Sequence, residues 1–541
     1  MLMDDQENVG WQAAGHGRAP AARGLAFKVA ALALVVFSLS ATGLALRLLQ
    51  APAPGDGTAS NGAGAKARPA LFRTWPAKQD PAVVLLLSGQ QHGYLQPCGC
   101  SRPQLGGLER RYNFVHTVLQ ARGWPVVAVD AGDIAQHSGP QALIKYKYSM
   151  EALKRLDYTA VGVGRNEMDL PLLDALSQFA LENPKPRTLA ANLLKKEDNF
   201  PGMLGSWQVS DNKVGAKVGI VTVVAPSVAK DVNDPAVKFE APERVLPGML
   251  KEVQARKPEL LVLVFQGSEE EAKACADKFR QFQVILCLTK EEEPPADPIV
   301  VGKTLVVRVG HKGRYVGLVG AYPTGKASPA FDLYYELVPM GEEYETPKGK
   351  DADNPVLALL ENYTKEVKRD NYLAQYSKSL HPIQVQFPKA TYVGSEKCKE
   401  CHEHAYKVWK DSPHAHAYHT LETAKRPSLC QYDGECVRCH VVGFQNQGGF
   451  TDEVKTPFLK DQGCENCHGP ASLHVKGNKT PRMLALMNPY KTQPGETPEQ
   501  KTRRENRLDA SCTKCHDTDN DHSWKLEKWL KIDHPTPESE K

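Results

Sequence analysis

The chain has 541 residues, enough for several domains, and 41% of them are hydrophobic and 24% charged, as in an ordinary globular protein. Its 67 basic and 63 acidic residues nearly cancel, leaving a net charge of +4. That balance argues against nucleic acid as a partner.

An apolar segment near the N-terminus predicts a membrane anchor. Residues 29–47 contain 18 consecutive uncharged, mostly apolar residues, which is near the lower limit for spanning a bilayer. Arg18, Arg23 and Lys28 precede the segment, so we expect residues 1–28 to stay in the cytoplasm. The segment also fits the core of a cleaved signal peptide, although no clean Ala-x-Ala site follows it. Either way the remaining chain is exported, and we favour a single-pass anchor in the cytoplasmic (inner) membrane with the bulk of the chain in the periplasm.

The next part of the chain predicts a linker followed by a layered α/β domain. Residues 48–80 are rich in Ala, Pro and Gly and are expected to form a flexible tether. Over residues 81–340, short apolar runs alternate with amphipathic stretches, which is typical of an α/β domain. Strands are predicted at 82–87, 125–129, 158–163, 218–224, 260–265, 284–288 and 304–309, and helices at 110–122, 141–156, 170–181 and 269–280.

Three motifs in this region resemble the metallophosphoesterase domain of 5′-nucleotidases, in the calcineurin-like superfamily. Asp130-Ala-Gly-Asp133 matches a D-A-G-D block at a strand end, and 106–111 (GGLERR) matches a G-G-L-x-R-R helix start. Ala191-Asn192 corresponds to a later A-N block. The resemblance covers about 260 residues and implies the layered fold of that family.

The resemblance also implies a site for two metal ions, and most of its ligands are replaced. His92 and Asp133 persist. A dinuclear site needs several anionic or imidazole ligands, so we expect a pseudo-enzyme without a divalent metal. A working nucleotide phosphohydrolase is the alternative. The replaced positions read Gln90 for the Asp of D-x-H, Gly164-Arg165-Asn166-Glu167 for G-N-H-E, Phe265-Gln266-Gly267 for a lone His, and Leu288-Thr289-Lys290-Glu291 for G-H-x-H.

Five cysteines fall outside the repeated motifs described below. Cys98 and Cys100 form a C-x-C pair on a predicted loop close to His92, where they are candidate catalytic thiols, a soft-metal site or a simple structural pair. Cys275 and Cys287 are expected to be core thiols or one disulfide. Cys430 has no predicted role.

The last part of the chain carries a pentapeptide, Cys-x-x-Cys-His, four times. It is the attachment signature of c-type haem, in which two thiols bind the porphyrin and the His binds iron. Zinc knuckles are the alternative for paired C-x-x-C motifs, but zinc does not explain a His after every pair. Residues 341–390 are expected to be a connector with a helix at about 355–376, and 391–541 a mostly α or irregular domain wrapped around four covalently bound haem c groups. The motifs are Cys398–His402, Cys436–His440, Cys464–His468 and Cys512–His516, with second thiols at Cys401, Cys439, Cys467 and Cys515.

The flanks of these motifs resemble the tetrahaem cytochrome c-554 family, from Gly394 to about Trp524. The matching segments are 409–415 (WKDSPHA), 439–449 (CHVVGFQNQGG) and 463–470 (GCENCHGP). The resemblance implies that His414 and His474 are distal iron ligands, opposite proximal ligands among His402, His440, His468 and His516. It also implies that the haem on His440 lacks a distal ligand. Further distal candidates are His404, His416, His419, His522 and His534.

Haems held by two histidines have no open position on the iron, so such haems pass electrons. We therefore expect an electron-transfer protein that works with periplasmic or membrane redox proteins. The alternatives are haem catalysis on a nitrogen oxide or a sulfur species at an open haem, and the metal-dependent hydrolase described above.

Overall fold

The computed structural model describes residues 71–97, 103–177, 184–210, 215–232, 234–235, 237–521 and 523–527. All of these belong to one compact unit, 70–541. The predicted anchor at 29–47 and the pair Cys98 and Cys100 lie outside the described residues, so both stay predictions. Within the described ranges, no helix is both long enough and apolar enough to cross a membrane.

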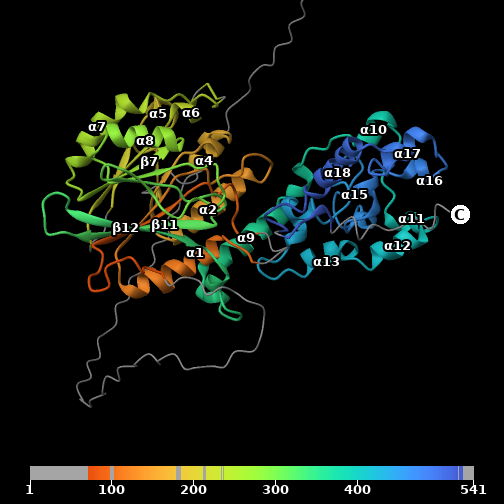
Figure 1. Ribbon diagram of the computed structural model, residues 1–541, viewed down its shortest axis with the longest axis horizontal. Coiled ribbons are helices and arrows are strands. Elements are labelled where there is room, and N and C mark those ends of the chain that lie inside the picture. Colours follow the sequence, from red (N-terminus) through yellow and green to blue (C-terminus); the bar gives the residue numbers. More distant parts are fainter. Residues whose placement is uncertain are drawn as a thin grey trace, which may run out of the picture. The chain divides into compact units, whose positions relative to one another are not determined.

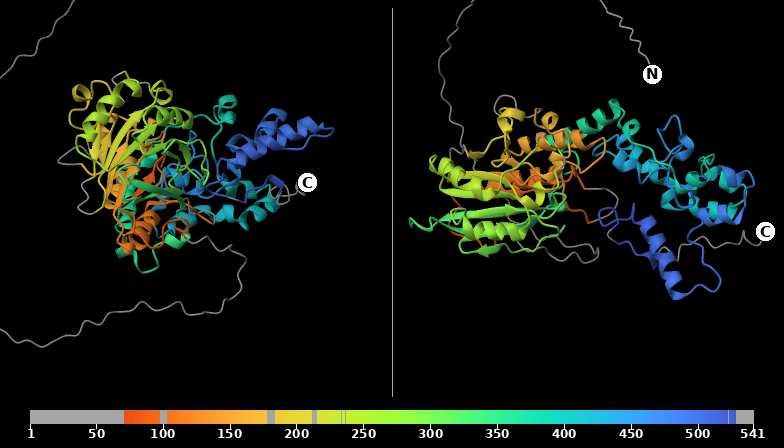
Figure 2. Two further views of the ribbon diagram at one scale, coloured as in Figure 1. Left: turned by 60° about the vertical axis from the view of Figure 1, so that its left-hand side comes forward. Right: turned by 90° about the horizontal axis from the view of Figure 1, so that it is seen from above.

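Two six-stranded sheets form the α/β region (Figure 1). The strand order is β12-β11-β1-β2-β3-β4 in the first sheet and β5-β6-β7-β8-β10-β9 in the second. Figure 2, left, shows the strands of the second sheet (yellow to green) as a twisted fan. The strands are β1 Val83–Ser88, β2 Val126–Asp130, β3 Tyr158–Gly162, β4 Arg187–Leu189, β5 Trp207–Val209, β6 Val218–Val224, β7 Leu260–Gln266, β8 Val284–Cys287, β9 Ile299–Val301, β10 Thr304–Val307, β11 Tyr315–Pro323 and β12 Phe331–Pro339.

The central strands of both sheets are parallel. Strands β1 to β4 pair in parallel in the first sheet, and β6, β7, β8 and β10 do so in the second. Parallel strands are covered on both faces, so they read as unbroken apolar runs, and β1 and β7 are buried along their whole length. All seven strands predicted from apolar runs are confirmed. The antiparallel strands β11 and β12, at one edge of the first sheet, had not been predicted.

Helices cover the outer face of each sheet, which makes four layers. On the first sheet, α1 (Leu108–Phe114), α2 (Ala142–Arg155) and α9 (Pro355–Arg369) share one apolar cluster with β1 and β11. On the second sheet, α7 (Pro242–Gln254) and α8 (Glu269–Lys278) pack on β6 to β8, as Figure 1 shows. A third cluster fills the space between the sheets. Helix α9, predicted within the connector, is therefore part of the α/β core.

Local signals explain where the main helices begin. The Ser268 side chain accepts a hydrogen bond from Glu271 N and starts α8 with a capping box. The Asn354 side chain caps α9 by accepting a hydrogen bond from Val356 N, with Pro355 at the first helical position. The shorter helices of the α/β region are α3 Arg165–Met168, α4 Leu172–Ser177, α5 Lys196–Asn199 and α6 Pro226–Ala229.

The C-terminal region is built from short helices and irregular segments, as predicted. Its buried apolar residues form two small clusters among the described residues, one around Tyr418 and Phe450 and one around Ile383 and Met483. The helices are α10 Pro382–Gln386, α11 Ser395–Lys399, α12 Glu403–Lys410, α13 Ala417–Glu422, α14 Gly434–Val437, α15 Cys464–His468, α16 Ser472–Val475, α17 Pro481–Met487 and α18 Pro498–Cys512.

Candidate functional site

Each Cys-x-x-Cys-His motif starts on a helix, and the motifs meet in pairs. The first thiol lies on α11, α14, α15 or the last residue of α18. The thiols of Cys398 and Cys464 are within hydrogen-bond reach of each other, as are those of Cys439 and Cys515. The first motif therefore adjoins the third, and the second adjoins the fourth.

Three of the four predicted proximal histidines are oriented by a hydrogen bond at Nδ1. His440 Nδ1 lies 2.6 Å from Ala417 O, and His468 Nδ1 lies 2.7 Å from Met487 O. His516 Nδ1 lies 3.0 Å from Asp521 Oδ2. When Nδ1 carries the proton that such a bond requires, Nε2 keeps its lone pair for a metal. These imidazoles therefore have the tautomer and orientation that an iron ligand needs.

Two pairs of imidazole rings lie at a separation that suits an iron atom. The ring centroids of His402 and His474 are 6.2 Å apart with the planes 21° from parallel. Those of His414 and His516 are 5.9 Å apart with the planes at 65°. With a metal–nitrogen bond of about 2 Å on each side, two imidazoles on one metal have centroids roughly 6 Å apart. His474 Nδ1 is also buried without a hydrogen-bond partner among the described residues. Both pairs fit haem iron.

The other histidine candidates differ from these pairs. His404, His416 and His419 are exposed, and His419 Nδ1 lies 3.5 Å from Glu422 Oε2. His522 and His534 lie outside the described residues. Within the part of the chain that is described, no imidazole pair of this kind is found at His440, whose ring packs beside Ala417 and Thr420.

In the α/β region, the positions that correspond to the metal motifs of the resemblance meet at the carboxyl ends of the strands. Uncharged partners join them. Gln90 Nε2 donates to Thr289 O and Thr289 N donates to Gln90 Oε1, both over 2.9 Å. This amide pair links the end of β1 to the end of β8, where the family pattern has an Asp and a His. Two of the substituted positions carry a positive charge. Lys290 is exposed, and Arg165 forms ion pairs at 3.7 and 3.2 Å with Asp169 and Asp231.

The surviving His92 is part of a neutral polar cluster. Its Nδ1 lies 2.9 Å from Asn166 Nδ2, and its ring stands edge-on to His311 with centroids 5.2 Å apart. Burial, followed by His311 and Lys312, lowers the pKa of His92 to about 4. His311 was not predicted as a site residue, because it belongs to none of the motifs described above. Across the described ranges, no group of three or more His, Cys, Asp or Glu is placed to hold a metal ion.

Glu167 holds the loops of this site together. Its carboxylate accepts hydrogen bonds from the backbone N–H groups of Gly164 at 2.7 Å, Ala135 at 2.8 Å and Asp133 at 2.9 Å. Asp133 Oδ1 accepts in turn from Asn166 N at 2.9 Å. Burial and then the neighbouring Asp133 raise the pKa of Glu167 to about 7. The persisting acidic residues thus have structural partners of their own.

An ion-pair network joins the segment after the fourth motif to the edge of this site. Asp519 Oδ2 lies 2.6 Å from Lys312 Nζ and accepts a hydrogen bond from Tyr94 OH at 2.9 Å, and Asp519 Oδ1 pairs with Arg314. Lys312 and Arg314 also pair with Glu292, at 2.5 and 2.8 Å. Asp519, Lys312 and Arg314 are 10, 17 and 11% exposed, so the network is largely shielded from water.

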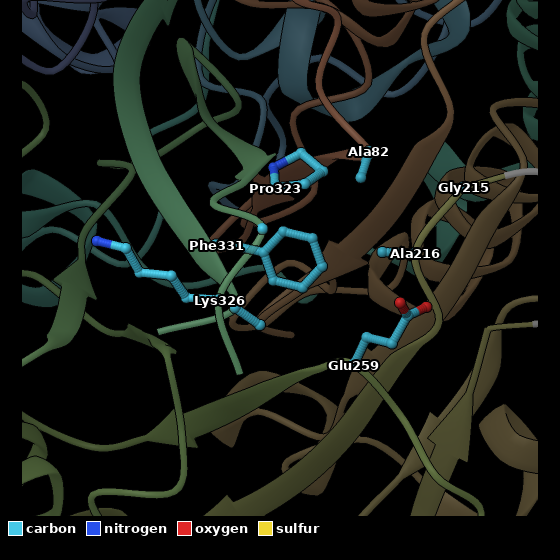
Figure 3. Close-up of a pocket in the computed structure, with 9 residues that line it drawn as sticks. Ala82, Gly215, Ala216, Glu259, Pro323, Lys326 and Phe331 are labelled. Carbon is cyan, nitrogen blue, oxygen red and sulfur yellow. The ribbon is translucent and has the colours of Figure 1, made fainter. Parts of the chain in front are cut away.

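An open groove of the α/β region lies away from this site, at the opposite ends of the strands (Figure 3). It is lined by residues at the starts of β1, β6 and β12, including Ala82, Ala216 and Phe331. Its charged lining residues are Glu259 and Lys326. No motif from the sequence falls in it.

The remaining thiols are separate and buried. Cys275 and Cys287 are free, which excludes the predicted disulfide alternative. Burial raises the pKa of each to about 12, so both behave as inert core residues. Cys430 is buried within hydrogen-bond reach of the haem-motif thiol Cys436 and donates to Pro427 O at 3.3 Å.

Comparison with known proteins divides the chain into two parts. Residues 397–469 match the family described as cytochrome c554 and c-prime. Cytochrome c-554 of Nitrosomonas europaea is 36% identical over 116 residues, which cover 17% of this chain and 49% of that protein. The chain therefore spans about half the length of this relative.

Solved structures are similar over about half of the chain. A 5′-nucleotidase precursor from Thermus thermophilus is 22% identical with a TM-score of 0.45, over 55% of this chain and 61% of that one. A sulfate thiohydrolase SoxB from the same species is 16% identical with a TM-score of 0.44, over 55% and 62%. The calcineurin-like phosphoesterase YfkN from Bacillus subtilis is 15% identical with a TM-score of 0.42, over 52% and 97%.

These proteins are of the two kinds that the motifs predicted. The chain joins an α/β region similar to 5′-nucleotidases and calcineurin-like phosphoesterases to a C-terminal segment, 397–469, that matches the family described as cytochrome c554 and c-prime.

Proposed function

We propose that this protein is a membrane-tethered tetrahaem c-type cytochrome that transfers electrons between redox partners outside the cytoplasm. The observation that carries the proposal is the spacing of two imidazole pairs, His402 with His474 and His414 with His516, each with the centroid separation of a two-histidine iron site. His414 and His474 are then the distal ligands. When bound, haem iron supplies a one-electron couple, and two protein ligands leave it no open position for chemistry.

The pairing of the motifs supports transfer between haems. The first and third motifs are in contact through the thiols of Cys398 and Cys464. The second and fourth are in contact through the thiols of Cys439 and Cys515. Cofactors attached to adjoining thiols lie next to each other. The protein contributes attachment and imidazole orientation through Nδ1.

The site of action follows from the attachment chemistry. C-type haem is attached outside the cytoplasmic membrane, and the apolar segment 29–47 with its basic flank provides export and a single anchor. The partners are then periplasmic or membrane redox proteins. The nearly balanced charge gives no reason to expect nucleic acid among them.

The test uses the full chain, produced in a host that attaches c-type haem. Haem is quantified per polypeptide, and spectra that distinguish low-spin from high-spin iron are compared for His474→Ala and for His404→Ala, a matched control on helix α12. We expect four haems per chain, one low-spin haem lost in His474→Ala, and no change in the control. Fewer than four haems per polypeptide, or equal spectra for the two variants, would contradict the proposal.

A second function is favoured by one observation, the different surroundings of His440. Its ring is oriented by Ala417 O, and the described residues place no second imidazole opposite it. A haem attached there would have a position for a small ligand such as NO, so haem catalysis on a nitrogen oxide or a sulfur species stays an alternative. Addition of CO to the reduced protein tests whether the His440 haem has an open position. A spectral shift in one haem of four supports the open site, and an unshifted spectrum contradicts it.

A further inference from the structure

A buried hydrogen-bond network joins the α/β layers to the second haem motif. Its centre is Gln141, a fully buried residue that directly precedes helix α2 and follows the loop from the metal-motif positions. Gln141 Nε2 donates to Asp433 Oδ1 at 2.9 Å and to Tyr363 OH at 2.6 Å. Gln141 Oε1 accepts from Tyr376 OH at 2.6 Å and from Gly434 N at 3.0 Å.

This geometry leaves Gln141 no unused hydrogen-bonding capacity. A glutamine amide has two N–H donors and an oxygen with two lone pairs, and all four are engaged here. Gly434 N can only donate, which fixes the amide oxygen on that side. A network that is complete and buried holds its members in one arrangement.

Asp433, one of the partners of Gln141, caps the helix on which the second haem motif begins. The Asp433 side chain is the N-cap of α14 and accepts from Glu435 N at 2.9 Å. The other oxygen of the same carboxylate accepts from Tyr363 OH at 2.8 Å, and Tyr363 lies on α9. Helix α14 carries Cys436, so the direction of this thiol depends on side chains of the α/β layers.

Two further contacts hold the same segment. Gln136 Nε2 donates to Glu435 Oε1 at 3.0 Å, from the loop that leads to Gln141. Upstream, Glu361 of α9 accepts from both the backbone and the hydroxyl of Ser428, each at 2.7 Å. The segment 428–435, which leads into the second motif, is therefore hydrogen-bonded to the α/β layers at both of its ends.

We propose that the α/β region forms part of the second haem site, with Gln141 as the residue that positions Cys436 and the following His440 for haem attachment. This rests on the proposed function only in requiring that haem is attached at this motif. The network gives the α/β region a role beside the cytochrome domain: its side chains supply hydrogen bonds that hold one haem motif.

The experiment compares Gln141→Leu with Ser149→Ala in the full chain, produced with haem attachment. Ser149 is a matched control, since it is buried on α2, the helix that Gln141 precedes, and its hydroxyl has no partner among the described residues. Peptide mass spectrometry measures haem occupancy at each motif, and a redox titration measures the midpoint potentials. In Gln141→Leu we expect occupancy at Cys436 and Cys439 to fall roughly fivefold or more, with the first and third motifs unchanged.

The milder variant Tyr363→Phe removes one hydroxyl from the same network and keeps the ring packing. It is expected to leave occupancy high and to shift the midpoint potential of the second-motif haem alone. If Gln141→Leu lowers occupancy equally at all four motifs, Tyr363→Phe decides, and an unshifted potential overturns the proposal. Full occupancy and wild-type potentials in both variants overturn it as well. A wild-type chain without haem at this motif would instead reject the proposed function, so the two failures are distinguishable.

Discussion

The α/β region and the C-terminal region exclude water in different ways. In the α/β region, apolar side chains fill continuous clusters between four layers, and strands such as β1 are buried throughout. In the C-terminal region, the described buried apolar residues form two small clusters. One region is stable through its own side chains, and the other is expected to depend on its cofactors for a core.

The largest expected effect is on removal of haem. A chain produced without haem attachment should keep a folded α/β region and lose ordered structure over about 391–527, because the second region lacks the apolar groups to replace its porphyrins. Limited proteolysis followed by peptide mapping measures this. Equal resistance of the two regions without haem would break the comparison.

A core truncation should affect the α/β region next most strongly. Leu86→Ala empties a site on β1 that is 0% exposed, and we expect a loss of about 2–5 kcal/mol in the free energy of unfolding of that region. Val300→Ala is the control on edge strand β9, where the side chain is 62% exposed, and it should change stability by under about 0.5 kcal/mol. Thermal unfolding followed by far-UV circular dichroism reports both, and similar losses would contradict the layered core.

The ion-pair network between the regions should contribute less, and with a defined pH dependence. Burial opposes ionisation of Asp519, but the hydrogen bonds and charge of Lys312, with Tyr94 and Arg314, outweigh it and hold the pKa of Asp519 below its usual value. A carboxyl with a lowered folded-state pKa stabilises the protein above its unfolded-state pKa of about 4, and this stability is lost as pH falls through the folded-state pKa.

Asp519→Asn should therefore cost about 1–3 kcal/mol at pH 7, where Glu292 still pairs with both cations. The difference from the wild type should shrink as pH drops below about 4. Unfolding midpoints of both proteins across the pH range provide the measurement. A difference that stays constant down to pH 2 would show that the ionised form of Asp519 contributes nothing.

The smallest effect is expected at an exposed histidine of the haem region. The His419 side chain is 71% exposed, and its contact with Glu422 is a surface pair. His419→Gln should change stability by under about 0.5 kcal/mol and leave the visible spectrum of the haems unchanged. A lost low-spin signal would add His419 to the iron ligands and alter the assignment of the haem region.

Much of the fold could be predicted from the sequence, because buried parallel strands are continuous apolar runs. Strand β11 was missed, and its glycines explain why. Gly320 lowers strand propensity, yet a Cβ atom there would lie 2.6 Å from the Trp75 ring, so the close packing of Trp75 on the sheet needs a glycine. The reason for the residue lies in a contact 245 positions away, which no local pattern contains.

The haem site and the α/β site also divide into features set by local sequence and features set by distant contacts. The haem motifs could be predicted because their chemistry fixes a local spacing. The facing of His402 and His474 needed the fold, although both residues had been named. Gln141 and His311 had no motif at all, and their importance comes from partners such as Asp433, 292 positions along the chain. Non-local hydrogen bonding of ordinary polar residues is what sequence patterns do not record.

The three backbone hydrogen bonds to Glu167 have a consequence for the rigidity of the neighbouring loops. Loops fastened by an internal carboxylate keep their shape whether or not a cation is bound. The loop that leads to Gln141 is fastened near its start by the same carboxylate, through Ala135 N. Its course therefore does not depend on a bound ion, and Gln141 reaches Asp433 from a rigid base.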